Sequence, residues 1–292
     1  MNPSPRVLVA GRHRLDLSRP LVMGILNVTP DSFSDGGRYA QVDRAIERGR
    51  RIVAEGADIV DVGGESTRPG AVPVDAEEEL RRVRPVVEAL AGAGIPVSVD
   101  TMKPAVMRAM LAHGIAMVND VRALREAGAI EAVAAGGAAV CLMHMRGTPG
   151  TMQLSTAYDD VVDEVRRFLA ERARACEDAG VPRERIVVDP GFGFGKGTAE
   201  NLVLLARLAE LADLGYPVLA GLSRKATIGA ITGRDGEGRL AGSVAASLAA
   251  VARGASIVRV HDVRETVDAL AVWRAVEGAP RTSAPALQSQ GA

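Results

Sequence analysis

Side chains that could bind or polarise a small molecule stand at the ends of the short apolar runs of this sequence. They are Asn27, Asp100, Asn119, Asp189, Ser223, Lys225, Arg259 and His261. Two buried carboxylates, an asparagine and a lysine suit a flat, nitrogen-rich heterocycle, because a carboxylate accepts two N–H donors and the amide and ammonium offer complementary donors. Arg259 and His261, with Asn27 nearby, suit a phosphorylated group, since a guanidinium can donate two hydrogen bonds to phosphate oxygens. The residue types thus predict subsites for a heterocycle, a diphosphate and a second anion.

A diphosphate subsite also predicts a magnesium ion. Magnesium neutralises the charge that develops on a leaving diphosphate and requires few protein ligands. Lys225 stands just before a predicted helix over 226–231, where backbone N–H groups can bind an anion. This position suits the second anion.

The same polar residues have a structural interpretation. Asp100, Asn119 and Asp189 could cap the helices that follow them, because Asp and Asn are favoured N-caps. For Asp120, capping is the favoured interpretation. Any one of these residues could be an ordinary loop residue. However, Asn, Asp, Lys, Arg and His together follow the apolar runs predicted to be strands, and this favours a shared site.

Several well-known motifs are absent or incomplete. The segment GFGFGKG over 191–197 resembles a phosphate loop, but a required glycine is missing and Gly197 follows the lysine where the pattern needs Ser or Thr. It also fails the spacing of the dinucleotide fingerprint, and HExxH, paired CxxC and GxSxG do not occur. The four histidines are too dispersed to predict a zinc cluster, and His13 and His113 are expected on the surface or at helix ends.

These residues need a scaffold that brings the ends of many strands together. Eight apolar runs are predicted to be buried strands, at 22–28, 59–62, 96–100, 116–119, 139–144, 186–189, 218–221 and 256–261. Amphipathic stretches separate or follow them, among them 42–55, 76–91, 158–179 and 266–276. Such a series pairs its strands in parallel with right-handed crossovers, and eight units predict a closed (β/α)8 TIM barrel of the α/β class. In this fold the active site lies at the C-terminal ends of the strands.

The chain is expected to form one domain with two short appendages. Residues 6–17 alternate apolar and polar side chains around Ala10 and Gly11, so residues 1–20 are predicted to form a hairpin that closes the bottom of the barrel. The barrel itself is predicted over 21–278. The tail over 279–292 is rich in Pro, Ser, Ala and Gln and is predicted to be disordered.

The composition excludes several classes of protein. The 292 residues are 47% hydrophobic and 24% charged, with a net charge of −1, which argues against a nucleic-acid or membrane-surface partner. Small aliphatic residues dominate and aromatic residues reach only 3%, as in a parallel core buried on both faces. The N-terminus lacks a signal-peptide pattern, no apolar run approaches the ~20 residues that span a bilayer, and Cys141 and Cys176 are expected as reduced thiols. A cytoplasmic protein is therefore predicted.

Taken together, the motifs resemble the dihydropteroate synthase family, the folate-pathway enzymes that sulfonamides block. The resemblance extends from about residue 21 to 271 and rests on the order of NVTPDSFSDGG, GGESTRPG, VDT, VND, LMHMRGTPGTMQ, DPGFGFGKG, SRK and RVHDV. It implies a transferase that condenses 6-hydroxymethyl-7,8-dihydropterin diphosphate with 4-aminobenzoate to give 7,8-dihydropteroate and diphosphate. A pterin-binding methyltransferase and a non-catalytic pterin-binding paralogue are the alternatives. The first has no diphosphate to hold, and the second would be favoured by loss of Asp100, Lys225 or Arg259, all of which are present.

The resemblance also implies a role for each motif residue. The pterin would be bound by Asp100, Asn119, Asp189 and Lys225, between the apolar walls Met143 and Phe194. Asn27 would contact magnesium, and Arg259 and His261 the diphosphate. The aminobenzoate subsite would be shaped by Phe33, Thr67, Arg68, Pro69 and Ser223.

The polar loop after the first strand would close over the bound substrates and exclude water. In the dissociative mechanism that the family implies, diphosphate leaves first and the aniline nitrogen captures a cationic pterin methylene. Asp35 would stabilise that cation, with Asp31 as the rival carboxylate, and Phe33 would confine the nucleophile.

Two positions depart from the family pattern. Ala226 stands where many relatives have serine, and Leu222 fills a threonine position, so both could alter the aminobenzoate subsite.

The resemblance also implies the oligomeric state, a homodimer formed through the later helices.

Overall fold

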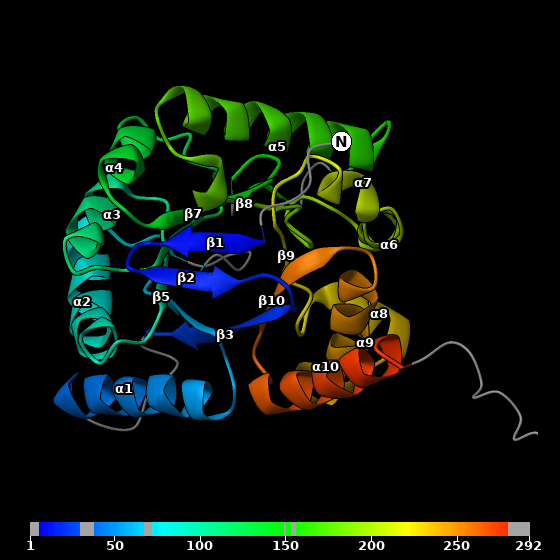
Figure 1. Cartoon of the computed structure of the whole chain (residues 1–292), viewed down its shortest axis with the longest axis horizontal. Helices are drawn as coiled ribbons and strands as arrows, with labels where there is room; N and C mark the ends of the chain where they lie inside the picture. Colours follow the sequence, from blue (N-terminus) through cyan, green and yellow to red (C-terminus); the bar gives the residue numbers. More distant parts are fainter. Residues whose placement is uncertain (1–5, 30–37, 67–71, 149, 153–155, 280–292) are drawn as a thin grey trace, which may run out of the picture.

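A closed barrel of eight parallel strands forms the centre of the molecule, with helices around it (Figure 1). The computed structural model describes residues 6–29, 38–66, 72–148, 150–152 and 156–279. The barrel strands are β3 (Leu21–Asn27), β4 (Ile59–Gly63), β5 (Val97–Asp100), β6 (Met117–Asp120), β7 (Ala139–Met143), β8 (Ile186–Asp189), β9 (Val218–Ala220) and β10 (Ala255–Val260). They follow one another around the barrel in chain order, and β10 closes it against β3. The predicted TIM barrel is confirmed.

Helices follow the strands and form the outer layer. They are α1 (Arg38–Ala54), α2 (Ala76–Gly92), α3 (Pro104–Leu111), α4 (Ala129–Ala135), α5 (Val161–Asp178), α6 (Thr198–Ala206), α7 (Ala209–Ala212), α8 (Ala226–Thr232), α9 (Leu240–Val251) and α10 (Val263–Glu277). The predicted helix over 158–179 begins later than expected, because Asp160 caps it by accepting the N–H groups of Val162 and Asp163. Short 3-10 turns, Arg183–Arg185 and Gly236–Arg239, precede β8 and α9.

The predicted N-terminal hairpin is present as β1 (Val7–Ala10) and β2 (His13–Asp16), paired antiparallel. Its turn uses Gly11 at a φ of 62°, a conformation that glycine adopts without steric cost. Leu8 and Ala10 are buried among the lower residues of the barrel, including Met23 and Met117. The hairpin therefore covers the N-terminal end of the strands.

The interior of the barrel changes character along its axis. Next to the hairpin it is apolar, with Met23, Ile59 and Met117 in one cluster. Toward the C-terminal ends of the strands, buried polar and charged residues replace them: Asp61, Ser98, Asn119 and Asp189. Burying a charged group costs free energy unless the group is paired or hydrogen-bonded. The C-terminal end of the barrel is therefore the candidate functional site.

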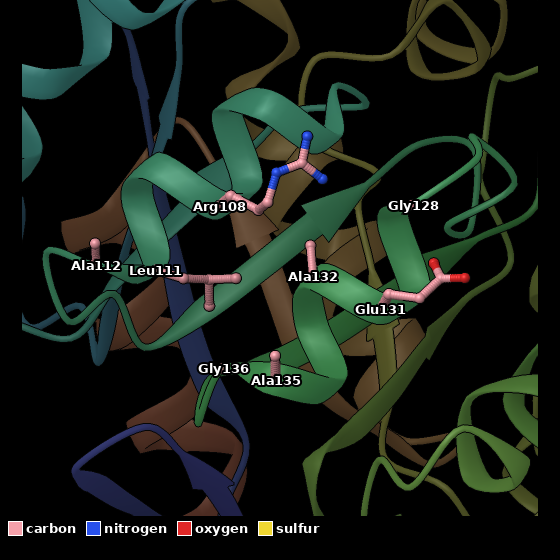
Figure 2. A pocket seen from close by; sticks show the side chains of 8 residues that line it. All are labelled: Arg108, Leu111, Ala112, Gly128, Glu131, Ala132, Ala135 and Gly136. Carbon is pink, nitrogen blue, oxygen red and sulfur yellow. The ribbon is translucent and has the colours of Figure 1, made fainter.

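A hollow of about 470 Å³ lies on the outside of the barrel, between α3 and α4 (Figure 2). Small side chains such as Ala112, Ala132 and Ala135 line it, together with Arg108 and Glu131. None of the site residues predicted from the sequence lines this hollow.

No helix within the described part of the chain is long and apolar enough to cross a membrane. Of the tail predicted to be disordered over 279–292, residues 280–292 lie outside the described residues. The domain limits drawn from the sequence remain a prediction.

Candidate active site

The register of the parallel strands brings three predicted site residues, Asn27, Asp100 and Asn119, to one level of the barrel together with Gly63. Asn27 is paired with Gly63, Gly63 with Asp100, and Asp100 with Asn119. Four consecutive strands thus end in a polar arc that surrounds a glycine. A side chain at Gly63 would place its Cβ 3.7 Å from both the amide oxygen of Asn27 and the Cβ of Asp100. The absent side chain leaves room between these two oxygen-bearing groups.

Arg259, on β10, reaches across the barrel to carboxylates of β4 and β5. Its Nε donates to Oδ2 of Asp61 at 2.6 Å, and its Nη2 donates to Oδ2 of Asp100 at 2.9 Å. Asn119 donates its side-chain N–H to the same oxygen of Asp61 at 3.2 Å. The other oxygen of Asp61 is buried and has no hydrogen-bond partner among the described residues. The network therefore holds one acceptor more than the described residues satisfy.

Burial raises the pKa values of the carboxylates at the C-terminal end of the barrel. It raises the pKa of Asp100 to about 7, with the Arg259 guanidinium opposing the shift and the Asp61 carboxylate adding to it. Burial likewise raises the pKa of Asp189 to about 6, although the backbone N–H of Gly191 and the nearby Lys225 oppose it. A bound ring that donates N–H groups would stabilise the ionised forms.

Asp189 ends β8 and leads into the glycine-rich segment over 191–197. Its Oδ1 accepts the backbone N–H of Gly191 at 2.7 Å, and its register partner on β7 is Met143. Lys225 lies above the Phe194 ring, with Nζ 4.2 Å from the ring centroid. Met143 and Phe194 belong to one small apolar cluster. An aspartate, a lysine and two apolar side chains thus meet here, as expected for a pocket that binds a flat ring.

Ser223 and His261 meet at the ends of β9 and β10. The Ser223 hydroxyl lies 3.0 Å from Nδ1 of His261 and accepts the backbone N–H of His261 at 3.2 Å. Burial and the Arg259 charge lower the pKa of His261 to about 4. The ring is therefore neutral at physiological pH, and when the hydroxyl donates to Nδ1 the ring proton lies on Nε2.

The residue between Ser223 and Lys225 is held in an unusual conformation. Arg224 has a φ of 57°, which is uncommon for a residue other than glycine. Its backbone N–H donates to the Ser243 hydroxyl at 2.9 Å, and its guanidinium pairs with Asp262. These contacts hold the strained residue in place and fix the directions of its two neighbours.

Comparison with known proteins identifies this arrangement. The model of the pterin binding enzyme family matches residues 23–261. The dihydropteroate synthase of Escherichia coli K12 is 52% identical over 262 residues, which cover 89% of this chain and 93% of that protein. The chain belongs to the dihydropteroate synthase family. Its members are transferases of folate biosynthesis, and so this chain is an enzyme of that class.

Solved structures of the family agree closely with the fold. Xanthomonas albilineans dihydropteroate synthase with 4-aminobenzoic acid is 57% identical, with a TM-score of 0.89 over 95% of this chain and 100% of that one. Burkholderia cenocepacia dihydropteroate synthase complexed with 7,8-dihydropteroate is 52% identical, with a TM-score of 0.85 over 95% of this chain and 98% of that one.

Some residues that the resemblance to this family singled out lie outside the described part of the chain. They are Phe33, Asp35, the alternative Asp31, and Thr67, Arg68 and Pro69. The roles assigned to them from the sequence remain predictions.

Two expectations about individual positions receive a structural answer. Asp120 accepts the backbone N–H groups of Arg122 and Leu124 within a turn, whereas the next helix, α4, begins after Gly128, so the predicted helix cap at Asp120 is wrong. Leu222 is 2% exposed and packs in the main hydrophobic core, so its side chain serves packing rather than lining a subsite. Ala226 is exposed at the start of α8.

Sequence reasoning missed two residues that the structure places in this region. Asp61 was passed over because it stands inside an apolar strand, although an aspartate in the run IVDVG was itself a signal. Lys196 was considered only as part of an imperfect phosphate loop, yet it is 2% exposed and hydrogen-bonded at the base of the site.

Proposed function

We propose that the chain joins 6-hydroxymethyl-7,8-dihydropterin diphosphate to 4-aminobenzoate at the C-terminal end of the barrel, releasing diphosphate and 7,8-dihydropteroate. The observation that carries this proposal is the cross-barrel network of Arg259, Asp61 and Asp100, with an oxygen of Asp61 that has no partner among the described residues. Such a network offers acceptors to an amino-pyrimidinone edge and donors to an anion at the same place. The reaction is also supported by the relatives, which are named dihydropteroate synthase, one of them in complex with 7,8-dihydropteroate.

The pterin ring would bind between β6 and β9. Asp189 would accept N–H donors from the amino-pyrimidinone edge, Asn119 and Asp100 would complete its hydrogen bonds, and Lys225 would donate to a ring acceptor. Met143 and Phe194 would contact the faces of the ring. Burial raises the pKa values of Asp100 and Asp189, and the N–H donors of a bound pterin would lower them again by stabilising the ionised carboxylates.

The diphosphate would bind beside Arg259 and His261. Two of the five guanidinium N–H donors are used by Asp61 and Asp100, so the others remain for phosphate oxygens. The neutral His261 would donate from Nε2. The side-chain oxygen of Asn27, beside the space at Gly63, fits the oxygen ligands that magnesium prefers. Asn27 would hold that ion, which when bound supplies positive charge to the leaving diphosphate.

In the reaction, the bond between the pterin methylene carbon and the diphosphate oxygen breaks, and its electron pair leaves with diphosphate. The amine nitrogen of 4-aminobenzoate then forms the new bond to the methylene and loses a proton to water. Asp35 would stabilise the intermediate cation electrostatically. No protein nucleophile is required.

The second substrate would occupy the mouth of the barrel. Phe33, Thr67, Arg68 and Pro69 would shape its subsite, with Ser223 and the N-terminal end of α8 near its carboxylate. Sulfonamides, which have the shape of 4-aminobenzoate, would compete at this subsite.

We propose that the enzyme acts as a homodimer in the cytoplasm. Large apolar side chains are exposed on α6, α8 and α10: Leu202, Val203, Ile231, Val272 and Val276. Contacts connect α6 with α8, α8 with α9 and α9 with α10, so these helices form one side of the barrel (Figure 1). Cys141 and Cys176 are free and buried, which suits a reducing compartment. Sedimentation of the wild-type protein and of Val272→Asp tests the dimer.

The decisive experiment measures diphosphate release by the purified protein, given the pterin diphosphate and magnesium, with and without 4-aminobenzoate. Release that depends on 4-aminobenzoate, with dihydropteroate formed in equal amount, is expected. Pterin binding without turnover would instead identify a non-catalytic pterin-binding protein. Methyl transfer from methyltetrahydrofolate to a corrinoid protein would identify a methyltransferase.

A further inference from the structure

Lysine is rare in this chain and is confined to one end of the barrel. Of 35 basic residues only three are lysine: Lys103, Lys196 and Lys225. They follow β5, β8 and β9 in the chain, so all three stand at the C-terminal ends of strands. Arginine serves every other basic position. An ammonium is compact and directs three donors in a tetrahedral arrangement, whereas a guanidinium is planar and larger. At these three positions the cation is therefore a compact ammonium and not a planar guanidinium.

Lys196 is the most deeply buried of the three, with 2% of its surface exposed. Its ammonium lies 2.9 Å from Nδ1 of His144, 3.0 Å from the Gly191 carbonyl oxygen and 3.0 Å from the Phe194 carbonyl oxygen. Three acceptors at these distances satisfy the three N–H donors. Burial lowers the pKa of His144 to about 2, so the ring is neutral, and Nδ1 accepts in the tautomer that carries its proton on Nε2. The side chain is thus bound to the loop that precedes it in the chain.

The loop around Lys196 is built so that the backbone can approach this close. Gly191, Gly193 and Gly195 all have φ between 67° and 80°, a region that favours glycine. A side chain at Gly191 would collide with the His144 carbonyl oxygen. From the outside, Tyr158 donates its hydroxyl to the Gly195 carbonyl at 2.8 Å, and Gly193 donates its N–H to Asn201 at 2.9 Å.

The same loop carries groups that face the candidate site. The Gly191 N–H is bonded to Asp189, and the Phe194 ring lies under Lys225. The two carbonyl groups that Lys196 holds belong to these same two loop residues, Gly191 and Phe194. Burial lowers the pKa of Lys196 to about 7, with the Asp189 charge opposing this shift and the Lys225 charge adding to it. The Lys196 charge in turn lowers the pKa of Asp189. Lys196 is therefore linked to the proposed pterin pocket by its hydrogen bonds to Gly191 and Phe194 and by its charge near Asp189.

We propose that Lys196 is a positioning residue for the reaction, whose buried ammonium fixes the loop over 190–197 so that Asp189 and Phe194 present themselves to the pterin ring. The inference rests on the proposed function, because it takes Asp189 and Phe194 as pterin contacts. Lys196 itself touches neither substrate. It acts through the Gly191 and Phe194 carbonyl groups and through His144.

A matched control exists at the other end of the same strand. Arg185, before β8, is also a buried cation and donates to backbone carbonyl groups of Ala138, Val133 and Gly136. Lys196 follows the C-terminal end of β8 at the site, whereas Arg185 precedes its N-terminal end. Arg185→Met and Lys196→Met each remove a buried cation that holds backbone oxygens, so both are expected to lower the melting temperature. Only Lys196→Met removes a cation next to the proposed pterin pocket, because Arg185 lies at the opposite end of β8.

The test titrates the wild-type enzyme, Lys196→Met, Lys196→Arg and Arg185→Met with 6-hydroxymethylpterin by calorimetry, and measures steady-state kinetics alongside. Both Lys196 variants are expected to weaken pterin binding on the order of tenfold or more and to lower kcat/KM for the pterin diphosphate similarly, whereas the KM for 4-aminobenzoate at saturating pterin stays within about twofold. Arg185→Met is expected to bind the pterin as the wild type does. Wild-type pterin affinity in Lys196→Met, or equal loss in Arg185→Met, would overturn the inference.

A second measurement needs no folded variant of Lys196. Protein labelled with ¹³C and ¹⁵N at lysine contains three side-chain signals, one for each lysine. The Lys196 signal, assigned by elimination with Lys103→Arg and Lys225→Arg, is expected to shift when the pterin binds and to remain in place with 4-aminobenzoate alone. An unmoved Lys196 signal at saturating pterin would refute the proposal. Failure of the wild type to synthesise dihydropteroate would instead refute the proposed function, so the two outcomes are separable.

Discussion

Nε of Arg259 lies 2.6 Å from Oδ2 of Asp61, although 198 residues separate them in the chain. The pair joins the last strand of the barrel to the second, and Asp61 is fully buried. A buried ion pair contributes little net stability, because desolvation offsets the attraction, but removal of one partner leaves a costly unpaired charge. The pair is therefore better understood as a device that fixes the guanidinium in direction than as a source of stability.

Replacing Asp61 by asparagine tests this role. Asp61→Asn keeps the shape of the side chain but removes the charge that aligns Arg259, so dihydropteroate synthesis is expected to fall on the order of 100-fold. The melting temperature is expected to fall as well, because the Arg259 guanidinium loses one of its two charged partners and keeps only Asp100. Turnover is measured by the coupled release of diphosphate.

Asp58 offers the control for that variant. It lies just before β4, pairs with Arg19 and accepts the Val22 N–H at 2.9 Å, at the opposite end of the barrel from the site. Asp58→Asn can keep the backbone hydrogen bond and is expected to retain wild-type turnover. Equal loss of activity in both variants would show that Asp61 acts through stability alone.

Lys225 is expected to be required for turnover and not for folding. Its ammonium lies over the Phe194 ring and lowers the pKa of Asp189, but part of the side chain faces solvent. Lys225→Ala would leave a buried ring acceptor of the pterin unbonded, and a lost partner of this kind costs on the order of 100-fold in kcat/KM. Circular dichroism checks the fold. A variant with wild-type rates would remove Lys225 from the site.

The pH dependence of stability reports the burial of Asp189. Its pKa is about 6 in the folded protein against the usual 3.8, so the folded state binds the proton more tightly than the unfolded state. Stability therefore falls as the pH rises from about 4 to about 6, by about 3 kcal/mol at most for a shift of this size. Asp189→Asn carries no titrating proton and can still accept the Gly191 N–H.

Urea denaturation at several pH values checks this expectation. Relative to wild type, Asp189→Asn is expected to gain stability between pH 4 and pH 7, while its turnover is strongly reduced because the ionised carboxylate is lost. Asp213→Asn, at an exposed position after α7, reports the effect of the same substitution away from the site. A difference in stability that stays constant with pH would contradict the assigned burial effect.

Much of the fold follows from the sequence because the barrel repeats one simple pattern. Each apolar run from Ile59 onward is bounded by polar or glycine residues, and the observed strands begin or end within two residues of those predicted. Parallel pairing and right-handed crossovers then leave few arrangements. The polar residues at the strand ends could be predicted for the same reason, since the fold places them on one rim.

Contacts between those residues could not be predicted in the same way. Nothing in the local sequence shows that Arg259 crosses the barrel to Asp61 and Asp100, because the pairing depends on barrel closure and strand register. The sequence gives no signal for Lys196, because two of its partners are carbonyl groups of its own loop and the third, His144, is distant in the chain. Such partners emerge only when the backbone conformation is known.

Lys103 stands at the base of another predicted substrate loop. Its ammonium pairs with Glu65, which follows β4, and with Oε2 of Glu79 on α2 at 2.5 Å. Glu79 is fully buried, and its other oxygen has no partner among the described residues. Arg82 donates to the Gly64 carbonyl at 2.9 Å, so α2 and Lys103 together anchor the start of the segment that continues to Thr67, Arg68 and Pro69.

Lys103→Met is therefore expected to displace this segment, because two carboxylates are left facing each other with no cation between them. The KM for 4-aminobenzoate should rise on the order of tenfold, with a smaller change in the KM for the pterin diphosphate and a lower melting temperature. Adding Glu79→Gln removes the unpaired buried charge, so the double variant should recover stability relative to Lys103→Met. Arg167→Met, which breaks an exposed ion pair on α5, is the neutral control. An unchanged KM for 4-aminobenzoate in Lys103→Met would show that the anchored segment does not shape that subsite.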